Sequence, residues 1–295
     1  MSKIGDLLEQ RFPGPPLTTH YDDLLSEYQR SGLAPPNMVP QVSSGDDGSL
    51  WAHIWEAMLY RYLTNLGFVF RRDRVKKSGQ DGPDFGVMHD GRTIWIEAIV
   101  PAPEGIPPDY LRSPKPGQIA FRSVPHQEIL LRWTGALRYK CQRLQSYRAK
   151  GIIEKQDCTV VAINDCRLSD YRPIETGVSG FPFAVEAVFP VGPIAVPISL
   201  DGQQPGEAIR TTRYTIRKQN RVDVPTANFL DEGYAGVSAL MGSTQRDMLD
   251  GKLRMTLVHN PLARMSLPIE ILDASKEYVA DHEGDEYFLH ELHQR

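Results

Sequence analysis

The stretch GPDFGVMHDGRTIWIEAIV, residues 82–100, limits the fold more than any other part of the chain. It divides at Asp90-Gly91, a dipeptide preferred in the two-residue turns of β-hairpins. A turn at this point sets Asp84 opposite Glu97 on the two strands, because paired positions are counted outward from the turn. The second strand is apolar on both faces apart from Glu97, which is typical of a central strand covered by helices. The sequence therefore predicts two carboxylates that face each other inside a sheet.

Two facing carboxylates need a partner of opposite charge. Directly opposed residues have Cβ atoms about 5 Å apart, and like charges at that distance are destabilising. In a low dielectric one of the two carboxylates would normally protonate. A hard cation such as Mg²⁺ (or Mn²⁺) removes the conflict, because it binds one or two carboxylates together with waters and phosphate oxygens. The alternative is a register shifted by one residue, in which Asp84 is a turn residue and Glu97 forms a salt bridge with an arginine.

Helices and further strands surround this hairpin. The apolar residues of 50–66 repeat at i, i+3, i+4 and i+7, which predicts an amphipathic helix with Ser49 as its N-cap and Gly67 after its end. Strands are predicted at 68–72 and 158–165, and a second long helix at 126–150. The order helix, strand, hairpin, helix, strand predicts an α/β fold, or α+β sandwich, with a central mixed sheet flanked by helices.

The chain is predicted to have three parts. Residues 1–48 form an N-terminal arm with a short helix at about 19–31, and residues 49–165 form the α/β core. Residues 166–295 are predicted as a β-rich C-terminal extension packed on the core. This last part contains strand-like runs, including FAVEAVF and LRMTLVH, and one predicted helix near 244–250. Its size and strand content suggest a homodimer formed through this part.

Composition excludes several classes of protein. The 295 residues include 33 Lys and Arg against 37 Asp and Glu, so the net charge of −4 provides no overall basic field for nucleic acid. The chain has no run of eighteen apolar residues, which excludes a membrane span, and its first residues lack the apolar segment of a signal peptide. The three cysteines, Cys141, Cys158 and Cys166, form no CxxC pair and suit a reducing compartment. We therefore expect a soluble cytoplasmic protein.

A hairpin with Pro83-Asp84 on one strand and Glu97-Ala98-Ile99 on the next resembles the PD-(D/E)xK nuclease superfamily. The resemblance extends from the first long helix to the strand after the second. It implies a restriction-endonuclease-like core with the order helix, three strands, helix, strand. It also implies a Mg²⁺-dependent endonuclease-type hydrolase that acts on nucleic acid, DNA more than RNA. Asp84 and Glu97 would be catalytic metal ligands, with the Ala98 carbonyl as a further ligand.

The resemblance implies roles for one more glutamate and for a lysine. Many members of the superfamily carry a glutamate on the first helix near the metal, and Glu56 matches this position, although a solvated rim position is the alternative. The superfamily usually has lysine where this chain has Ile99. Some divergent members carry that lysine on the second core helix, where Lys140 falls within the apolar stripe. Lys140 is thus the candidate for a relocated catalytic lysine, and a lysine that snorkels from the stripe is the alternative.

A basic run precedes the first carboxylate. It contains Arg71, Arg72, Arg74, Lys76 and Lys77. Next to a catalytic site, these side chains would bind backbone phosphates, which gives affinity without sequence information. A solvated loop is the alternative interpretation. The two lysines of the run are also weaker rivals of Lys140 for the catalytic role.

Three functional hypotheses follow from these features. The first is a metal-dependent phosphodiesterase or endonuclease. The second is a catalytically inactive nuclease-fold protein that binds nucleic acid or a protein partner, which Ile99 and the acidic net charge favour. The third is an unrelated α/β fold in which the carboxylates are structural. The chain contains no HExxH, paired CxxC, Walker A or GxSxG sequence, so other common catalytic motifs do not compete.

Overall fold

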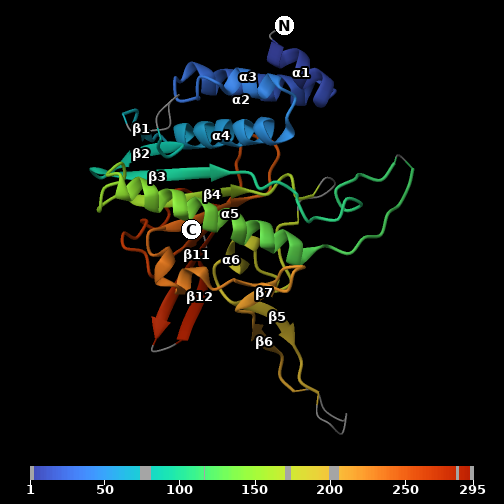
Figure 1. The fold of residues 1–295 in the computed structure, drawn as a ribbon, viewed down its shortest axis with the longest axis vertical. Coiled ribbons are helices and arrows are strands. Elements are labelled where there is room, and N and C mark those ends of the chain that lie inside the picture. The colour runs from blue at the N-terminus through green and yellow to red at the C-terminus, as the bar shows by residue number, and fades with distance from the viewer. Residues whose placement is uncertain are drawn as a thin grey trace.

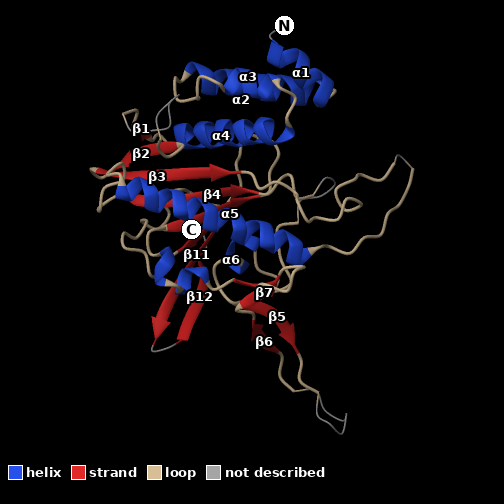
Figure 2. Ribbon diagram, in the orientation of Figure 1, coloured by secondary structure: helices blue, strands red, loops and turns tan. Residues whose placement is uncertain are grey.

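The structure is a computed structural model that describes residues 3–73, 81–115, 117–169, 174–198, 206–283 and 286–292. Figure 2 distinguishes its helices from its strands. The α-helices are α1 (Lys3–Arg11), α2 (Pro15–Arg30), α3 (Met38–Ser43), α4 (Asp47–Asn65), α5 (His126–Ala149) and α6 (Phe183–Glu186). The strands are β1 (Val69–Phe70), β2 (Phe85–His89), β3 (Arg92–Ile99), β4 (Cys158–Asn164), β5 (Val191–Ala195), β6 (Ile209–Thr212), β7 (Thr215–Arg217), β8 (Asp223–Pro225), β9 (Ala239–Ser243), β10 (Thr256–His259), β11 (Lys276–Glu283) and β12 (Glu286–Leu292). Two short 3₁₀ helices, η1 (Asn228–Leu230) and η2 (Glu232–Tyr234), precede β9.

One mixed sheet of eight strands organises the fold (Figure 1). Its order is β1-β2-β3-β4-β9-β10-β11-β12, with parallel pairing at β3–β4, β4–β9 and β10–β11 and antiparallel pairing elsewhere. The residues of β4 and β9 are all buried, as expected of central strands covered on both faces. The predicted α/β architecture, a central mixed sheet flanked by helices, is therefore confirmed.

The β2–β3 hairpin has the predicted register. Phe85 pairs with Ile96, and the same register carried one step outward sets Asp84 against Glu97. Asp90 and the glycine after it have positive φ angles of 46° and 74°, as a type I′ turn requires. The alternative register, shifted by one residue, is therefore wrong. Asp84 lies directly before the first residue of β2, and its Oδ2 accepts the backbone N–H of Ala98 across the hairpin.

The two long helices cover the sheet from opposite sides (Figure 1). Glu97 of β3 faces Lys140 of α5. The strand pleat turns the neighbouring Ile96 to the other face, where its partner Phe85 contacts the ring of Tyr28 in α2 at 5.9 Å between centroids. The helices α1 to α3 pack on the outer side of α4, as Figure 1 shows. The residues next to the hairpin are therefore enclosed between α5 and the N-terminal helices.

The first long helix begins three residues earlier than predicted. The N-cap of α4 is Asp46, whose Oδ2 accepts the backbone N–H of Ser49 at 2.7 Å. The prediction of Ser49 as N-cap is wrong, because a carboxylate three residues earlier already satisfies its N–H group. The end of the helix is as predicted, with Gly67 in the left-handed region at φ 79°.

Two predictions for the C-terminal part are wrong. The run FAVEAVF, residues 183–189, contains the helix α6 and no strand. A short run of buried apolar residues has no periodicity that separates a strand from a helical turn. The predicted helix near 244–250 is a series of turns between β9 and β10, in which the Gln245 amide bonds the carbonyls of Asp247 and Lys252.

A continuous cluster of buried side chains joins the three predicted parts of the chain. It extends from Ile4 and Leu8 in α1 through both long helices to Tyr278 in β11. Strands β9 to β12 of the C-terminal part belong to the same sheet as the predicted core.

Within the described ranges, none of the helices combines the length and apolar character that a membrane span requires.

Gly86 allows an unusually close contact between the hairpin strands. A Cβ at this position would lie 2.6 Å from the ring of Trp95, its cross-strand partner. The ring is fully buried and donates its Nε1–H to Asp157 at 2.8 Å, so it cannot move without losing that bond. We expect Gly86→Ala to lower the free energy of unfolding by about 1–3 kcal/mol in urea denaturation. Gly135→Ala is the control, because a Cβ there meets no atom within 4 Å; equal stability of the two variants would contradict this packing.

Candidate functional site

Asp84, Glu97 and Lys140 meet where β2 begins and β3 ends. The Glu97 side chain is fully buried, and the Asp84 and Lys140 side chains are only 4% and 6% exposed. The Lys140 amine lies 3.4 Å from Asp84 Oδ2 and donates a short hydrogen bond to Glu97 Oε2. Asp84 Oδ2 also accepts the backbone N–H of Ala98 at 2.8 Å. The structure thus brings the two predicted carboxylates and the predicted lysine into one ionic cluster.

Helix α5 carries Lys140 into the interior. Lys140 belongs to the buried stripe of the helix, with Trp133 and Leu137 before it and Leu144 one turn after it. An amine buried in this way is costly unless charged partners accompany it. The two carboxylates of the hairpin supply those partners. The alternative of a lysine that snorkels to solvent is therefore wrong, whereas the catalytic role of Lys140 stays a prediction.

Burial and neighbouring charges leave the pKa values of Glu97 and Lys140 both raised. Burial and the neighbouring Asp84 raise the pKa of Glu97 to about 7, against the opposing effect of Lys140 and Arg143. Burial lowers the pKa of Lys140, but the charges of Asp84 and Glu97 outweigh it, and the net shift is upward. The cluster therefore pairs an amine whose charged form is favoured with a carboxyl whose pKa is raised toward neutral pH.

The hydrogen bond from Lys140 involves only one of the two carboxylate oxygens of Glu97. Glu97 Oε1 is buried and has no hydrogen-bond partner among the described residues. A buried acceptor without a partner is rare and costs free energy, so such atoms often mark an ion or a water. Carboxylate oxygens are the ligands that Mg²⁺ prefers. The Glu97 and Asp84 carboxylates therefore fit a cation that takes its remaining ligands from water and substrate.

Glu56 is buried on the neighbouring helix α4. Its Oε2 accepts the Tyr28 hydroxyl at 3.3 Å and lies 3.2 Å from His53 Nδ1. The solvated rim position considered for Glu56 is therefore wrong. In the part of the chain that the structure describes, no three His, Cys, Asp or Glu side chains form a group that could hold a metal ion. Glu56 is thus not gathered with Asp84 and Glu97, and its role as a ligand stays a prediction.

Arg143 also lies next to the cluster, although it was not predicted from the sequence. It follows Lys140 by one turn of α5 and donates its Nε–H to the Tyr147 hydroxyl at 3.0 Å. Its Nη2 lies 3.8 Å from Asp81, in the segment that leads into β2. Burial lowers the pKa of Arg143, but Glu97 and Tyr147 outweigh this effect and the net shift is upward. The i, i+3 spacing from Lys140 is the sequence signal that could have identified it.

The structure describes only part of the basic run. Arg71 donates to Thr93 Oγ1 and to Asp73 Oδ1, both at 2.9 Å, and its guanidinium lies 5.7 Å from the ring centroid of Trp95. Arg71 is therefore bound within the fold, whereas Arg72 is exposed. Three of the predicted phosphate contacts lie outside the described residues: Arg74, Lys76 and Lys77.

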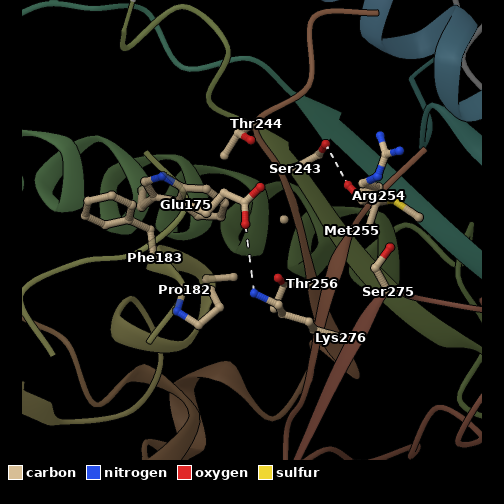
Figure 3. A pocket seen from close by; sticks show the side chains of 13 residues that line it. Glu175, Pro182, Phe183, Ser243, Thr244, Arg254, Met255, Thr256, Ser275 and Lys276 are labelled. Atoms are coloured by element: carbon tan, nitrogen blue, oxygen red, sulfur yellow. Dashed lines mark hydrogen bonds and ion pairs between the residues drawn. The ribbon is translucent and has the colours of Figure 1, made fainter. Parts of the chain in front are cut away.

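A separate cavity of about 120 Å³ lies at the end of β9 (Figure 3). Trp133 and Phe183 form apolar parts of its wall, and Glu175 reaches toward Lys276, whose amine is 3.9 Å from the carboxylate. Trp133 precedes Lys140 by seven residues of α5, which corresponds to about 10 Å along the helix. The cavity is thus distinct from the ionic cluster, and no residue that the sequence argument selected lines it.

Comparisons of the chain with protein-family models, with curated proteins and with solved structures gave no significant match. The resemblance to the PD-(D/E)xK superfamily therefore rests on the hairpin residues and on the order of the elements. The ionic cluster of Asp84, Glu97 and Lys140 is the structural observation from which a function can be argued.

Proposed function

We propose that this protein is a metal-dependent phosphodiesterase of the endonuclease type that acts on nucleic acid, DNA rather than RNA. The observation that carries this proposal is the Lys140 amine of α5, held between the carboxylates of Asp84 and Glu97 at the hairpin. In the PD-(D/E)xK superfamily, which the hairpin resembles, a lysine near the paired acidic residues completes the site. Ile99 occupies the usual position of that lysine, and Lys140 would replace it from the facing helix.

Each residue of the cluster has a role in this proposal. Asp84 and Glu97 would hold Mg²⁺ or Mn²⁺, with the Ala98 carbonyl as the further ligand that the resemblance implies. Such a cation lowers the pKa of a bound water and neutralises charge on the phosphate. Lys140 orients the attacking water and stabilises the negative charge that develops on the phosphate oxygens. Without a cation the pKa of Glu97 is raised to about 7, so a proton would compete with the metal for this carboxylate below neutral pH.

A catalytically inactive nuclease-fold protein that binds nucleic acid or a protein partner is the second candidate. The observation in its favour is that the amine of Lys140 already contacts both carboxylates. A buried ionic cluster of this kind also occurs as a purely structural element. This candidate predicts binding without cleavage. A cytoplasmic location, predicted from composition, and a homodimer formed through residues 166–295, predicted from the size and strand content of that part, stay predictions.

Cleavage of supercoiled plasmid in Mg²⁺ or Mn²⁺ tests the proposed function. We expect the wild-type protein to nick or linearise the plasmid, and Asp84→Asn and Glu97→Gln each to slow the reaction by about 100-fold or more. Asp165→Asn is the control, because Asp165 is an equally buried carboxyl that lies outside the cluster. Binding of the plasmid with no cleavage in either metal would contradict the proposal and support the second candidate.

A further inference from the structure

A groove of about 470 Å³ runs between α5 and the β7–β8 pair, on the side of the helix opposite Lys140. Gly135 and Arg138 line it from the far side of the helix, about 140° and 160° around the axis from Lys140, and Arg132 lines it at about 80° when each residue turns by 100°. The other wall includes Arg217, the last residue of β7, and Lys218 in the connection to β8; Glu104 also lines the groove. A hydrogen bond of 2.9 Å from the Gln127 amide to the Arg217 carbonyl joins the two walls. We refer to this feature as the cationic groove.

The charges of the cationic groove are only partly neutralised. Arg132 pairs with Glu104 at 3.0 Å, and Arg217 pairs with Asp223 at 3.0 Å. Two further cations of the groove, Arg138 and Lys218, are exposed and have no carboxylate within ion-pair distance among the described residues. Four cations line the groove against two carboxylates, Glu104 and Glu128, so its lining is positive in a chain whose net charge is −4. A local basic surface of this kind favours a polyanion.

Gly135 provides a second observation that does not depend on charge. It lies in the interior of the 24-residue helix α5, where glycine costs about 1 kcal/mol relative to alanine. Packing does not require it, because a Cβ there would meet no atom within 4 Å. The residue is exposed on the floor of the groove, one turn from Arg132 on one side and from Arg138 on the other. A bare helix surface between two arginines allows a ligand backbone to approach closely.

We propose that the cationic groove binds the phosphodiester backbone of a nucleic acid. Arg138 and Lys218 would contact phosphates from the two walls, and Gly135 would leave room for the sugar-phosphate chain on the floor. Guanidinium groups match phosphate oxygens in bidentate geometry. Glu104, which lines the groove, follows Glu97 by seven residues, so the groove and the ionic cluster are joined by a chain segment of at most about 25 Å. This inference rests on the proposed function, because that function supplies the choice of nucleic acid over an acidic peptide.

Binding of fluorescently labelled DNA by the full-length Glu97→Gln protein in EDTA tests this inference without cleavage. We expect Arg138→Ala/Lys218→Ala to weaken binding about tenfold and to reduce the slope of log K against log salt by about 2, since each phosphate contact contributes about 0.9. Gly135→Ala should weaken binding while it raises the melting temperature. The control is Lys155→Ala/Lys252→Ala, which removes two exposed lysines outside the groove and should leave the slope unchanged.

Several results would overturn the inference. One is a groove variant that binds DNA with the affinity and salt slope of the parent protein. Another is a parent protein that binds a polyglutamate peptide more tightly than DNA, because the groove would then be a peptide site. The proposed function is tested separately by metal-dependent cleavage. If the wild-type protein cleaves plasmid and the groove variants bind DNA with normal affinity, the groove proposal fails and the proposed function stands.

Discussion

Lys140→Met is expected to lower the free energy of unfolding by about 3–5 kcal/mol at pH 7.5, because it leaves Asp84 and Glu97 buried together with no cation. Methionine preserves most of the side-chain volume, so the loss reports the charge and not a cavity. The destabilisation should diminish toward pH 5, where protonation of one carboxyl removes the repulsion between the two. Urea denaturation at the two pH values measures both effects.

Lys150→Met is the matched control on the same part of the chain. Lys150 follows the last residue of α5 and pairs with Asp81, but its side chain is 52% exposed. An exposed pair of this kind contributes about 0–1 kcal/mol. If Lys140→Met and Lys150→Met cost the same free energy at pH 7.5, the buried ionic cluster does not exist as described.

The wild-type protein in EDTA is expected to lose stability as the pH rises from about 4.5 to about 7. The pKa of Glu97 is about 7 in the folded chain and 4.5 in the reference state, and burial is the main cause of the rise. Over this range the folded chain retains a proton that the unfolded chain has released, so the free energy of unfolding falls with pH. At 1.36 kcal/mol per pKa unit, the contribution of Glu97 is about 3 kcal/mol. Asp165, whose pKa burial also raises to about 7, adds a contribution of the same sign.

Denaturation of Glu97→Gln at pH 5 and pH 8 isolates this contribution. The glutamine does not titrate, so we expect the difference in unfolding free energy between the two pH values to shrink by about 3 kcal/mol. The double variant Glu97→Gln/Asp165→Asn should reduce the difference further. Glu9→Gln, at an exposed position of α1, is the control and should leave it unchanged. A difference in Glu97→Gln as large as in the wild type would show that Glu97 is ionised in the folded protein well below neutral pH.

Local rules made the core of the candidate site predictable. The Asp90-Gly91 turn and the strand pleat fix which residues oppose each other, so Asp84 and Glu97 could be paired from the sequence. The helical repeat placed Lys140 on the buried face of α5 in the same way. Periodicity gives only the buried face for Lys140; its meeting with the two carboxylates was predicted from the resemblance to the PD-(D/E)xK superfamily.

Features that depend on distant parts of the chain were not predictable. The sequence shows no reason why β9 should lie next to β4, which brings Gly242 under the ring of Trp133. The wall of the cationic groove that carries Arg217 and Lys218 comes from a segment about eighty residues away from α5. Periodicity and turn dipeptides describe neighbours in the sequence, and they contain no information on which surfaces meet after folding.

We propose that Lys140 performs from α5 the role for which the chain lacks a lysine at position 99. Ile99 lies two residues after Glu97, so the two side chains point to the same face of β3. The rate of Mg²⁺-dependent plasmid cleavage should therefore fall by about 100-fold or more in Lys140→Met. It should recover in Lys140→Met/Ile99→Lys, where the amine returns to the hairpin. Cleavage by Lys140→Met at the wild-type rate, or a folded double variant no faster than Lys140→Met, would contradict the claim.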